Sequence, residues 1–131
     1  MALSKATVFF AYPVEQVWRT VTNLSRTAWR SDLVKVEILD ECHFAEHDKS
    51  GHVTRFAVTA REPLRVWAFT MENENMTGSW EGVFEAAADG TRLHCTERIR
   101  AKHWWMRPLV PAYLKHQQRL YLDDLKKELL K

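Results

Sequence analysis

The first part of the chain changes from a strand pattern to a helix pattern at a proline. Residues 7–12 (TVFFAY) are β-branched and aromatic, which is typical of a strand, and Pro13 ends the run because it cannot donate to a sheet ladder. Residues 13–23 have apolar side chains at the i, i+3, i+4, i+7 spacing of an amphipathic helix: Val14, Val17, Trp18 and Val21. Ser25 can cap a second short helix over residues 25–30, in which Trp29 packs inward. We therefore expect one strand followed by two short helices.

After residue 32 the hydrophobic period shortens to two, which indicates strands. Consecutive strands joined by short turns are predicted over residues 33–41, 42–47, 52–61, 64–73, 77–87 and 91–100. The last of these is the most clearly amphipathic, because Leu93, Cys95, Glu97 and Ile99 alternate with basic and polar residues. One face of this strand should therefore face water.

The end of the chain predicts a connector and a long helix. Residues 102–111 contain two prolines and the adjacent Trp104 and Trp105, so we expect a loop there. Residues 111–131 carry an apolar stripe near Gln118, formed by Leu114, Tyr121, Leu122, Leu125 and Leu129. The element order predicts an α+β fold in which the terminal helix covers the concave face of a curved antiparallel sheet. Unless side chains fill it, the space between them is a pocket for a small molecule.

Composition narrows the class of protein. With 131 residues, 46% of them hydrophobic and 27% charged, residues 1–131 are expected to form a single domain that needs neither metal nor disulfide. A net charge of +2, with acids interspersed, does not predict nucleic-acid binding. No apolar run approaches the roughly 20 residues of a membrane span. The two cysteines are far apart and no leader pattern is present, so we expect a cytoplasmic protein without a cofactor.

Three short patterns together carry a family resemblance. They are Pro13-x-Glu15-x-Val17-Trp18 at the start of the first helix, Trp29 after it, and Gly90-Thr91-x-Leu93 at the start of the last strand. In this order the chain resembles, over essentially its whole length, the SRPBCC (START, Bet v 1-like, polyketide cyclase/dehydrase) superfamily. The resemblance implies a helix-grip fold: a curved seven-stranded antiparallel sheet wraps the long C-terminal helix around a cavity for lipids, sterols, polyketides or other hydrophobic ligands. Members include carriers, cyclases, ring-hydroxylase subunits and chaperone-cofactor domains, so the fold implies no single chemistry.

The candidate ligand-binding residues face the inside of the predicted sheet or lie on the terminal helix. They are Phe56, Val58, Trp67, Phe69, Met71, Trp80, Phe84, Cys95, Glu97, Tyr113, Gln117 and Tyr121. Aromatic residues at strand period fill a closed core as readily as they line an open pocket, so both alternatives remain. The six tryptophans favour pocket walls, because large rigid rings lose little entropy when they are ordered.

Glu97 is the weak candidate for a catalytic residue, and no other catalytic residue is predicted. A carboxyl group facing an apolar cavity has a raised pKa, which makes it usable as an acid, a base or a hydrogen-bond partner of a ligand. The alternative is that Glu97 reaches water or forms an ion pair with Arg65 or Arg107.

No metal site is predicted. One hairpin carries four residues of metal-ligating types: Cys42, His43, His47 and His52. His43 and His47 lie on the same face of their predicted strand, but Cys42 lies on the other face. The chain also contains no HExxH, GxSxG, P-loop or GxGxxG pattern.

Three functions follow from these observations. The first is binding of a small hydrophobic or aromatic ligand in the cavity. The second is a polyketide cyclase, aromatase or dehydratase that uses Glu97 as acid or base. The third is a chaperone-cofactor-like interaction module with a closed core, acting through an outer surface such as Trp104 and Trp105. For these tryptophans packing against the end of the sheet, a lid, a dimer contact and a transient membrane contact all remain open, as do a monomer and a homodimer.

Overall fold

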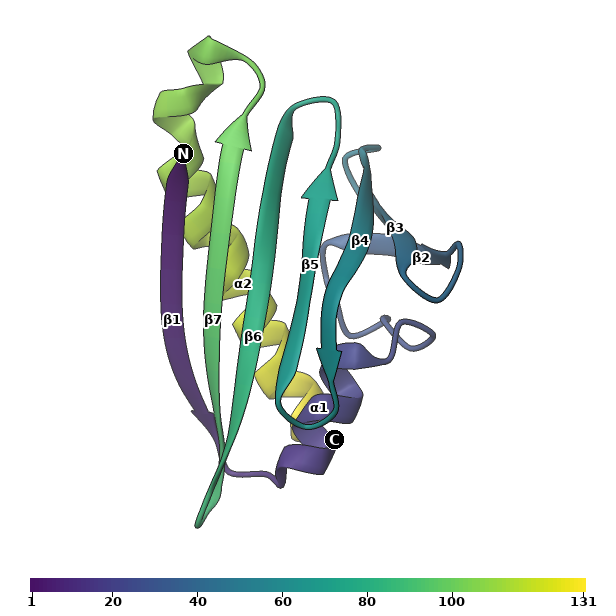
Figure 1. The fold of residues 1–131 in the computed structure, drawn as a ribbon, viewed down its shortest axis with the longest axis vertical. Helices are drawn as coiled ribbons and strands as arrows, with labels where there is room; N and C mark the ends of the chain where they lie inside the picture. Colours follow the sequence, from purple (N-terminus) through teal and green to yellow (C-terminus); the bar gives the residue numbers. More distant parts are fainter.

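The computed structural model describes residues 1–131 and is built on a seven-stranded antiparallel sheet with the strand order β1-β7-β6-β5-β4-β3-β2 (Figure 1). The first strand therefore pairs with the last, and the other neighbours follow the chain as a meander. The elements are β1 Ala2–Phe10, α1 Val14–Thr22, β2 Leu33–Ile38, β3 His43–Asp48, β4 Val53–Glu62, β5 Val66–Glu72, β6 Met76–Ala87, β7 Gly90–Ala101, the 3₁₀ helix η1 Trp104–Leu109 and α2 Val110–Leu129.

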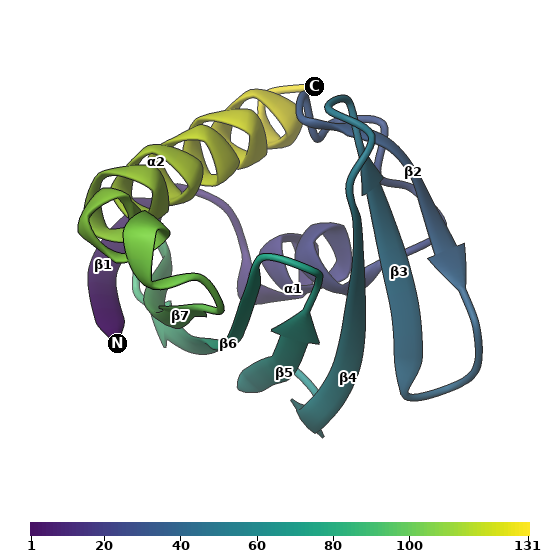
Figure 2. The ribbon, with the colours of Figure 1, turned by 90° about the horizontal axis from the view of Figure 1, so that it is seen from above.

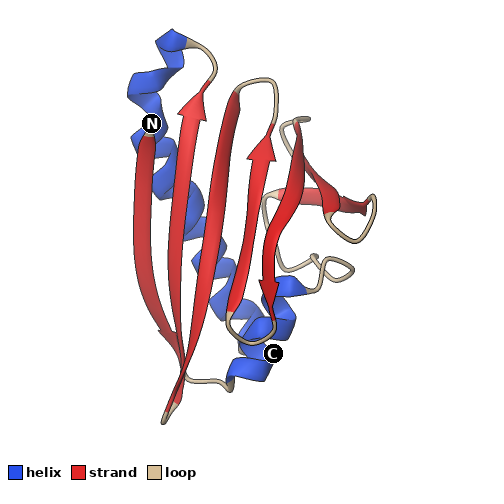
Figure 3. Cartoon of the chain, in the orientation of Figure 1, coloured by secondary structure: helices blue, strands red, loops and turns tan.

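The sheet curves, and both α-helices lie on its inner side. In Figure 2 the strands turn from β1 round to β2, with α2 and α1 inside the curve. The long α2 packs against β1, β7 and α1, while α1 also contacts β6 and β7. This is the predicted α+β helix-grip arrangement, and the assignment of helices and strands is drawn in Figure 3.

Burial alternates along the strands as the sequence pattern predicts. On β7, Leu93, Cys95 and Ile99 are buried, and Arg92, Arg98 and Arg100 on the other face are exposed. The apolar stripe of α2 meets this inner face through Leu114, Leu122, Leu125 and Leu129, all buried. The core thus lies between the two α-helices and the concave face of the sheet, and it extends across the sheet to Phe44 on β3.

The structure corrects the start of the chain in two places. The first strand begins at Ala2 rather than at Thr7, because residues 2–6 pair with β7 from Ala2 opposite Ile99 onward. The predicted second helix over residues 25–30 does not form. Ser25 does not cap a helix; its backbone N–H instead donates to Oδ1 of Asn23. The segment that follows is held by contacts to β3 and α2, described below, and this tertiary anchoring overrides local helix propensity.

The remaining predicted elements agree with the structure to within a few residues at their ends. The connector predicted over residues 102–111 is partly helical, because it contains η1 and the first turn of α2. None of the helices combines the length and the hydropathy that crossing a bilayer requires.

Candidate ligand-binding site

A cavity of about 140 Å³ lies between the concave face of the sheet and α2. Its wall comes from strands β3 to β7, from α2, and from the segment that joins α1 to β2. The volume is close to that of an apolar cavity of about 150 Å³ that admits benzene, and it is below the roughly 300–1,000 Å³ of pockets for drug-sized ligands. The space therefore matches a single ring or a short chain.

Most of the residues predicted to bind ligand line this cavity: Phe56, Trp67, Phe69, Met71, Trp80, Cys95, Glu97, Tyr113, Gln117 and Tyr121. Val58 and Phe84 lie outside the lining. Phe84 is buried where α1 covers β6, and its ring packs edge-on against Trp18 at a centroid distance of 5.0 Å. Val58 is partly buried against the core, beside the irregularity in the pairing of β4 with β5.

The sheet side of the cavity is a continuous aromatic wall centred on Phe69. The ring of Phe69 stacks on Trp80 at 5.4 Å and meets Phe56 edge-on at 5.1 Å, and Phe56 stacks on Phe44 at 4.7 Å between centroids. On the helix side, Tyr121 contacts Trp80 edge-on at 6.0 Å. Such rings bury large apolar areas with few rotatable bonds, so they form a rigid wall.

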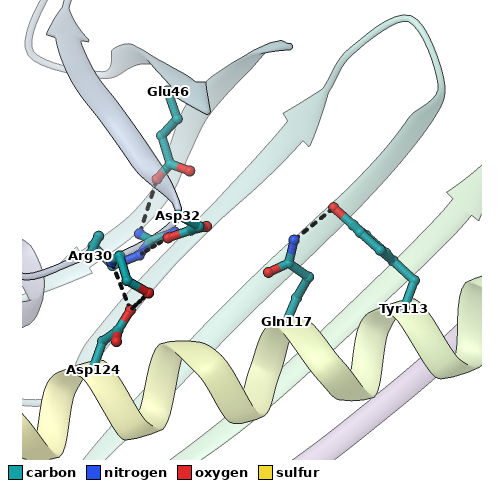
Figure 4. A network of polar contacts seen from close by, with 7 residues as sticks. Arg30, Asp32, Glu46, Tyr113, Gln117 and Asp124 are labelled. Atoms are coloured by element: carbon teal, nitrogen blue, oxygen red, sulfur yellow. Dashed lines mark hydrogen bonds and ion pairs between the residues drawn. The ribbon is translucent and has the colours of Figure 1, made fainter. Parts of the chain in front are cut away.

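One end of the cavity is formed by a largely buried ion-pair cluster that the sequence pattern did not predict. Arg30 donates two hydrogen bonds of 3.2 Å to the carboxylate of Asp32 and one of 3.3 Å to Glu46 (Figure 4). Its guanidinium also lies 5.0 Å from the ring centroid of Tyr121. Burial disfavours the charge, but Glu46 and Asp32 outweigh this and raise the pKa of Arg30 above its usual value.

The segment that carries Arg30 is tied to α2. Both the backbone N–H and the hydroxyl of Ser31 donate 2.8 Å hydrogen bonds to Oδ2 of Asp124, as Figure 4 shows. Asp124 is buried. The available sequence signal for this cluster was Glu46, an acid on the same strand parity as the buried Phe44.

Glu97 faces the cavity without a protein partner. In the sheet it lies directly between Ser4 on β1 and Trp80 on β6, and its carboxyl group makes no hydrogen bond or ion pair. Burial raises the pKa of the Glu97 carboxyl to about 7, while Arg30 lowers it and Glu46 raises it more weakly. The alternative ion pair with Arg65 or Arg107 is wrong, because Arg65 pairs with Glu62 and Arg107 lies near Met1 and Val110.

Two neighbouring glutamines of α2 also line the cavity. Gln117, which was predicted, donates from Nε2 to the hydroxyl of Tyr113 at 3.1 Å, and the partly exposed Tyr113 marks the rim. Gln118 accepts a 2.6 Å hydrogen bond from Ser4 through Oε1, but its buried Nε2 has no partner. Its place next to the apolar stripe of the predicted helix was the signal that this amide is buried.

The hairpin histidines pair with carboxylates. His43 Nδ1 lies 2.9 Å from Asp40, and His47 Nε2 lies 3.3 Å from Glu37. The structure contains no group of three or more His, Cys, Asp or Glu side chains arranged to hold a metal ion. Cys42 and Cys95 are free thiols.

Fold and cavity together define a helix-grip protein, and comparison with known families gives the family. The family model described as polyketide cyclase / dehydrase and lipid transport matches residues 1–130. The chain therefore belongs to this family, within the SRPBCC superfamily, whose fold typically binds hydrophobic ligands. No curated protein sequence matches the chain.

Solved structures share the fold at low sequence identity. A START superfamily protein from Mycobacterium smegmatis is 14% identical, with 98% of this chain and 99% of that chain covered and a TM-score of 0.86. A conserved protein from Geobacillus kaustophilus is 13% identical, with 98% and 95% covered and a TM-score of 0.86. The di-domain ARO/CYC protein BexL, from a biosynthetic pathway, is 13% identical with a TM-score of 0.82. The match covers 98% of this chain and 46% of BexL.

Proposed function

We propose that this protein binds a small hydrophobic or aromatic molecule in the cavity between the sheet and α2. The observation that carries the proposal is the aromatic wall of Phe56, Phe69 and Trp80, which leaves about 140 Å³ unfilled beside α2. Removing apolar area from water contributes about 25 cal/mol per Å², so such a wall supplies most of the binding free energy. The open cavity favours this function over an interaction module with a closed core.

The size of the cavity favours a compact ligand among the lipid, sterol and polyketide-like classes. A space of about 140 Å³ accepts a single ring or a short chain without rearrangement. A whole sterol or a long-chain lipid would need the rim to open, and the partly exposed Tyr113 lies at that rim.

Native mass spectrometry of gently purified protein, followed by organic extraction, tests this proposal. We expect an adduct that the wild type and the Trp104→Ala variant retain and that Trp80→Ala loses. Trp104 is a matched control, because it is a tryptophan far from the cavity wall and 77% exposed. A bare polypeptide mass, together with no thermal stabilisation by single-ring aromatic compounds at millimolar concentration, would contradict ligand binding.

A second function is supported by one specific observation, the state of Glu97. A carboxyl group with a pKa of about 7 and no protein hydrogen bond can take up or release a proton near neutral pH. This is the requirement for a cyclase, aromatase or dehydratase acting on a polyketide-like substrate. Under this proposal Glu97→Gln abolishes turnover of such a substrate and preserves its binding, whereas unchanged turnover would remove Glu97 from the mechanism.

We also propose that η1 makes a transient contact with an anionic membrane surface. Trp104 and Trp105 are 77% and 59% exposed, and residues 98–122 contain no acidic side chain. Arg100 and Arg107 border the same surface pocket as Met1, and the N-terminus lies near η1 at one end of the molecule (Figure 1). Tryptophan suits the headgroup region, and each basic residue near anionic lipid contributes about 1 kcal/mol.

Co-sedimentation with vesicles tests the membrane contact. Vesicles that contain phosphatidylserine should bind the wild type more strongly than pure phosphatidylcholine vesicles, and the double variant Trp104→Ser/Trp105→Ser should lose this binding. Equal binding of wild type and variant would contradict the contact.

A further inference from the structure

The register of β1 with β7 places Ser4 beside Glu97, whose side chain lines the cavity. Ser4 lies directly opposite Glu97, and opposed residues of neighbouring strands project from the same face with their Cβ atoms about 5 Å apart. The Ser4 hydroxyl donates a 2.6 Å hydrogen bond to Oε1 of Gln118. This bond orients the Gln118 amide, which lines the same cavity as the Glu97 carboxyl group.

Glu97 and Gln118 both line the cavity, and each has a polar group without a hydrogen-bond partner. The Nε2 donor of Gln118 is buried without an acceptor, in a residue only 8% exposed. The carboxyl group of Glu97 receives no hydrogen bond and forms no ion pair, although it lies among Trp80, Cys95 and Ile99. Buried polar groups in native proteins are normally paired, so the unpaired Gln118 donor, in the same cavity as the partly buried and unpaired Glu97 carboxyl group, indicates the position of a ligand group.

Resting on the ligand binding proposed above, we infer that Glu97 and Gln118 recognise a neutral hydroxyl group, phenolic or alcoholic, on a ring-sized ligand and exclude ligands that end in a carboxylate. A hydroxyl oxygen accepts from Gln118 Nε2 while its proton is donated to the Glu97 carboxylate. When Glu97 is protonated, the same oxygen accepts from both groups. A carbonyl group cannot donate, so it satisfies only the protonated state.

The surrounding charges reinforce the exclusion of anions. The guanidinium of Arg30 is the cation that lines the cavity, and its charge is already balanced by ion pairs with Asp32 and Glu46, which take three of its five N–H donors. Asp48 and Glu97 add further negative charge to the wall. A ligand carboxylate therefore finds no free cation and is repelled by Glu97.

Three ring-sized probes, titrated at pH 8 by calorimetry or ligand-observed NMR, test the inference. Toluene reports hydrophobic binding alone, phenol adds a hydroxyl group, and benzoate adds a carboxylate. We expect phenol to bind about tenfold more tightly than toluene, as one hydrogen bond to a charged group allows, and benzoate not to bind. The Gln118→Leu variant should lose part of the preference for phenol, because the ligand oxygen no longer receives the Nε2 hydrogen bond, while its toluene affinity is retained. Glu97→Gln should gain benzoate binding, because it removes the repulsion and adds an amide donor.

The possible results separate hydroxyl recognition by Glu97 and Gln118 from the hydrophobic ligand binding on which it rests. Toluene and phenol binding with equal affinity to the wild type, or benzoate binding as tightly as phenol, would overturn hydroxyl recognition and leave the hydrophobic site intact. Binding of neither toluene nor phenol would overturn the site itself. If Gln118→Leu does not fold, the gain of benzoate binding by Glu97→Gln decides, and its absence would count against the inference.

Discussion

The indole ring of Trp80 lies directly over Gly82, two positions along the same strand. A Cβ atom at Gly82 would come within 2.5 Å of the Trp80 ring, and the neighbouring Leu93 leaves it little further room. The missing side chain therefore sets how flat Trp80 lies against the sheet, and so how much of the cavity stays open.

Gly82→Ala should push the Trp80 ring into the cavity. We expect weaker toluene binding and a free energy of unfolding lowered by roughly 1–3 kcal/mol, as for other overpacked interiors. Urea unfolding and toluene titration measure the two effects, with Ser79→Ala on the opposite face of β6 as the control. An unchanged toluene affinity would show that Trp80 does not limit the cavity.

Arg30→Met should be strongly destabilising. Removing the guanidinium leaves Asp32 and Glu46 as uncompensated, largely buried charges, at a cost of about 3–5 kcal/mol. Arg65→Met breaks the surface pair with Glu62 and should cost less than about 1 kcal/mol. Similar losses in the two variants, measured by urea unfolding, would mean that the Arg30 cluster contributes no more than a surface ion pair.

Glu97 should make stability fall as pH rises. Its folded-state pKa is about 7, above the ordinary 4.5, so between these pH values the folded chain holds a proton that the unfolded chain has released. The associated stabilisation is complete below about pH 4.5 and is lost as the pH rises through about 7. In Glu97→Gln this loss is absent, so the variant should gain about 3 kcal/mol relative to the wild type across the window. Urea unfolding at pH 4.5 to 8 checks this, and a constant difference between the two proteins would contradict the raised pKa.

The pair Ser4 and Gln118 should be dispensable for folding. Ser4→Ala alone should cost about 1 kcal/mol, because it leaves the Gln118 amide with no partner at either end. Adding Gln118→Leu replaces the unpaired amide with an apolar group of similar size, so the double variant should be at least as stable as the wild type. A double variant less stable than Ser4→Ala would show that the amide is satisfied in the free protein.

Local periodicity was sufficient to predict the meander, the amphipathic β7 and the buried stripe of α2, because each depends on alternation within one element. It also selected Glu97, an acid on an apolar parity. Local periodicity could not predict which residues lie beside Glu97 or form ion pairs with Arg30. Ser4 reaches Glu97 only through the pairing of the first strand with the last, and the Arg30 cluster joins a loop to β3. The predicted second helix failed for the same reason, since Ser31 is held by Asp124 of α2.

Under the proposed function, a ring-sized ligand occupies the space between Trp80 and α2. Isotope-filtered NOE spectra of labelled protein with unlabelled toluene test it most directly. We expect saturable binding with contacts from toluene protons to Phe69, Trp80 and Tyr121, and none to Trp104. Contacts confined to Trp104 and Trp105, or no saturable binding at millimolar toluene, would contradict it.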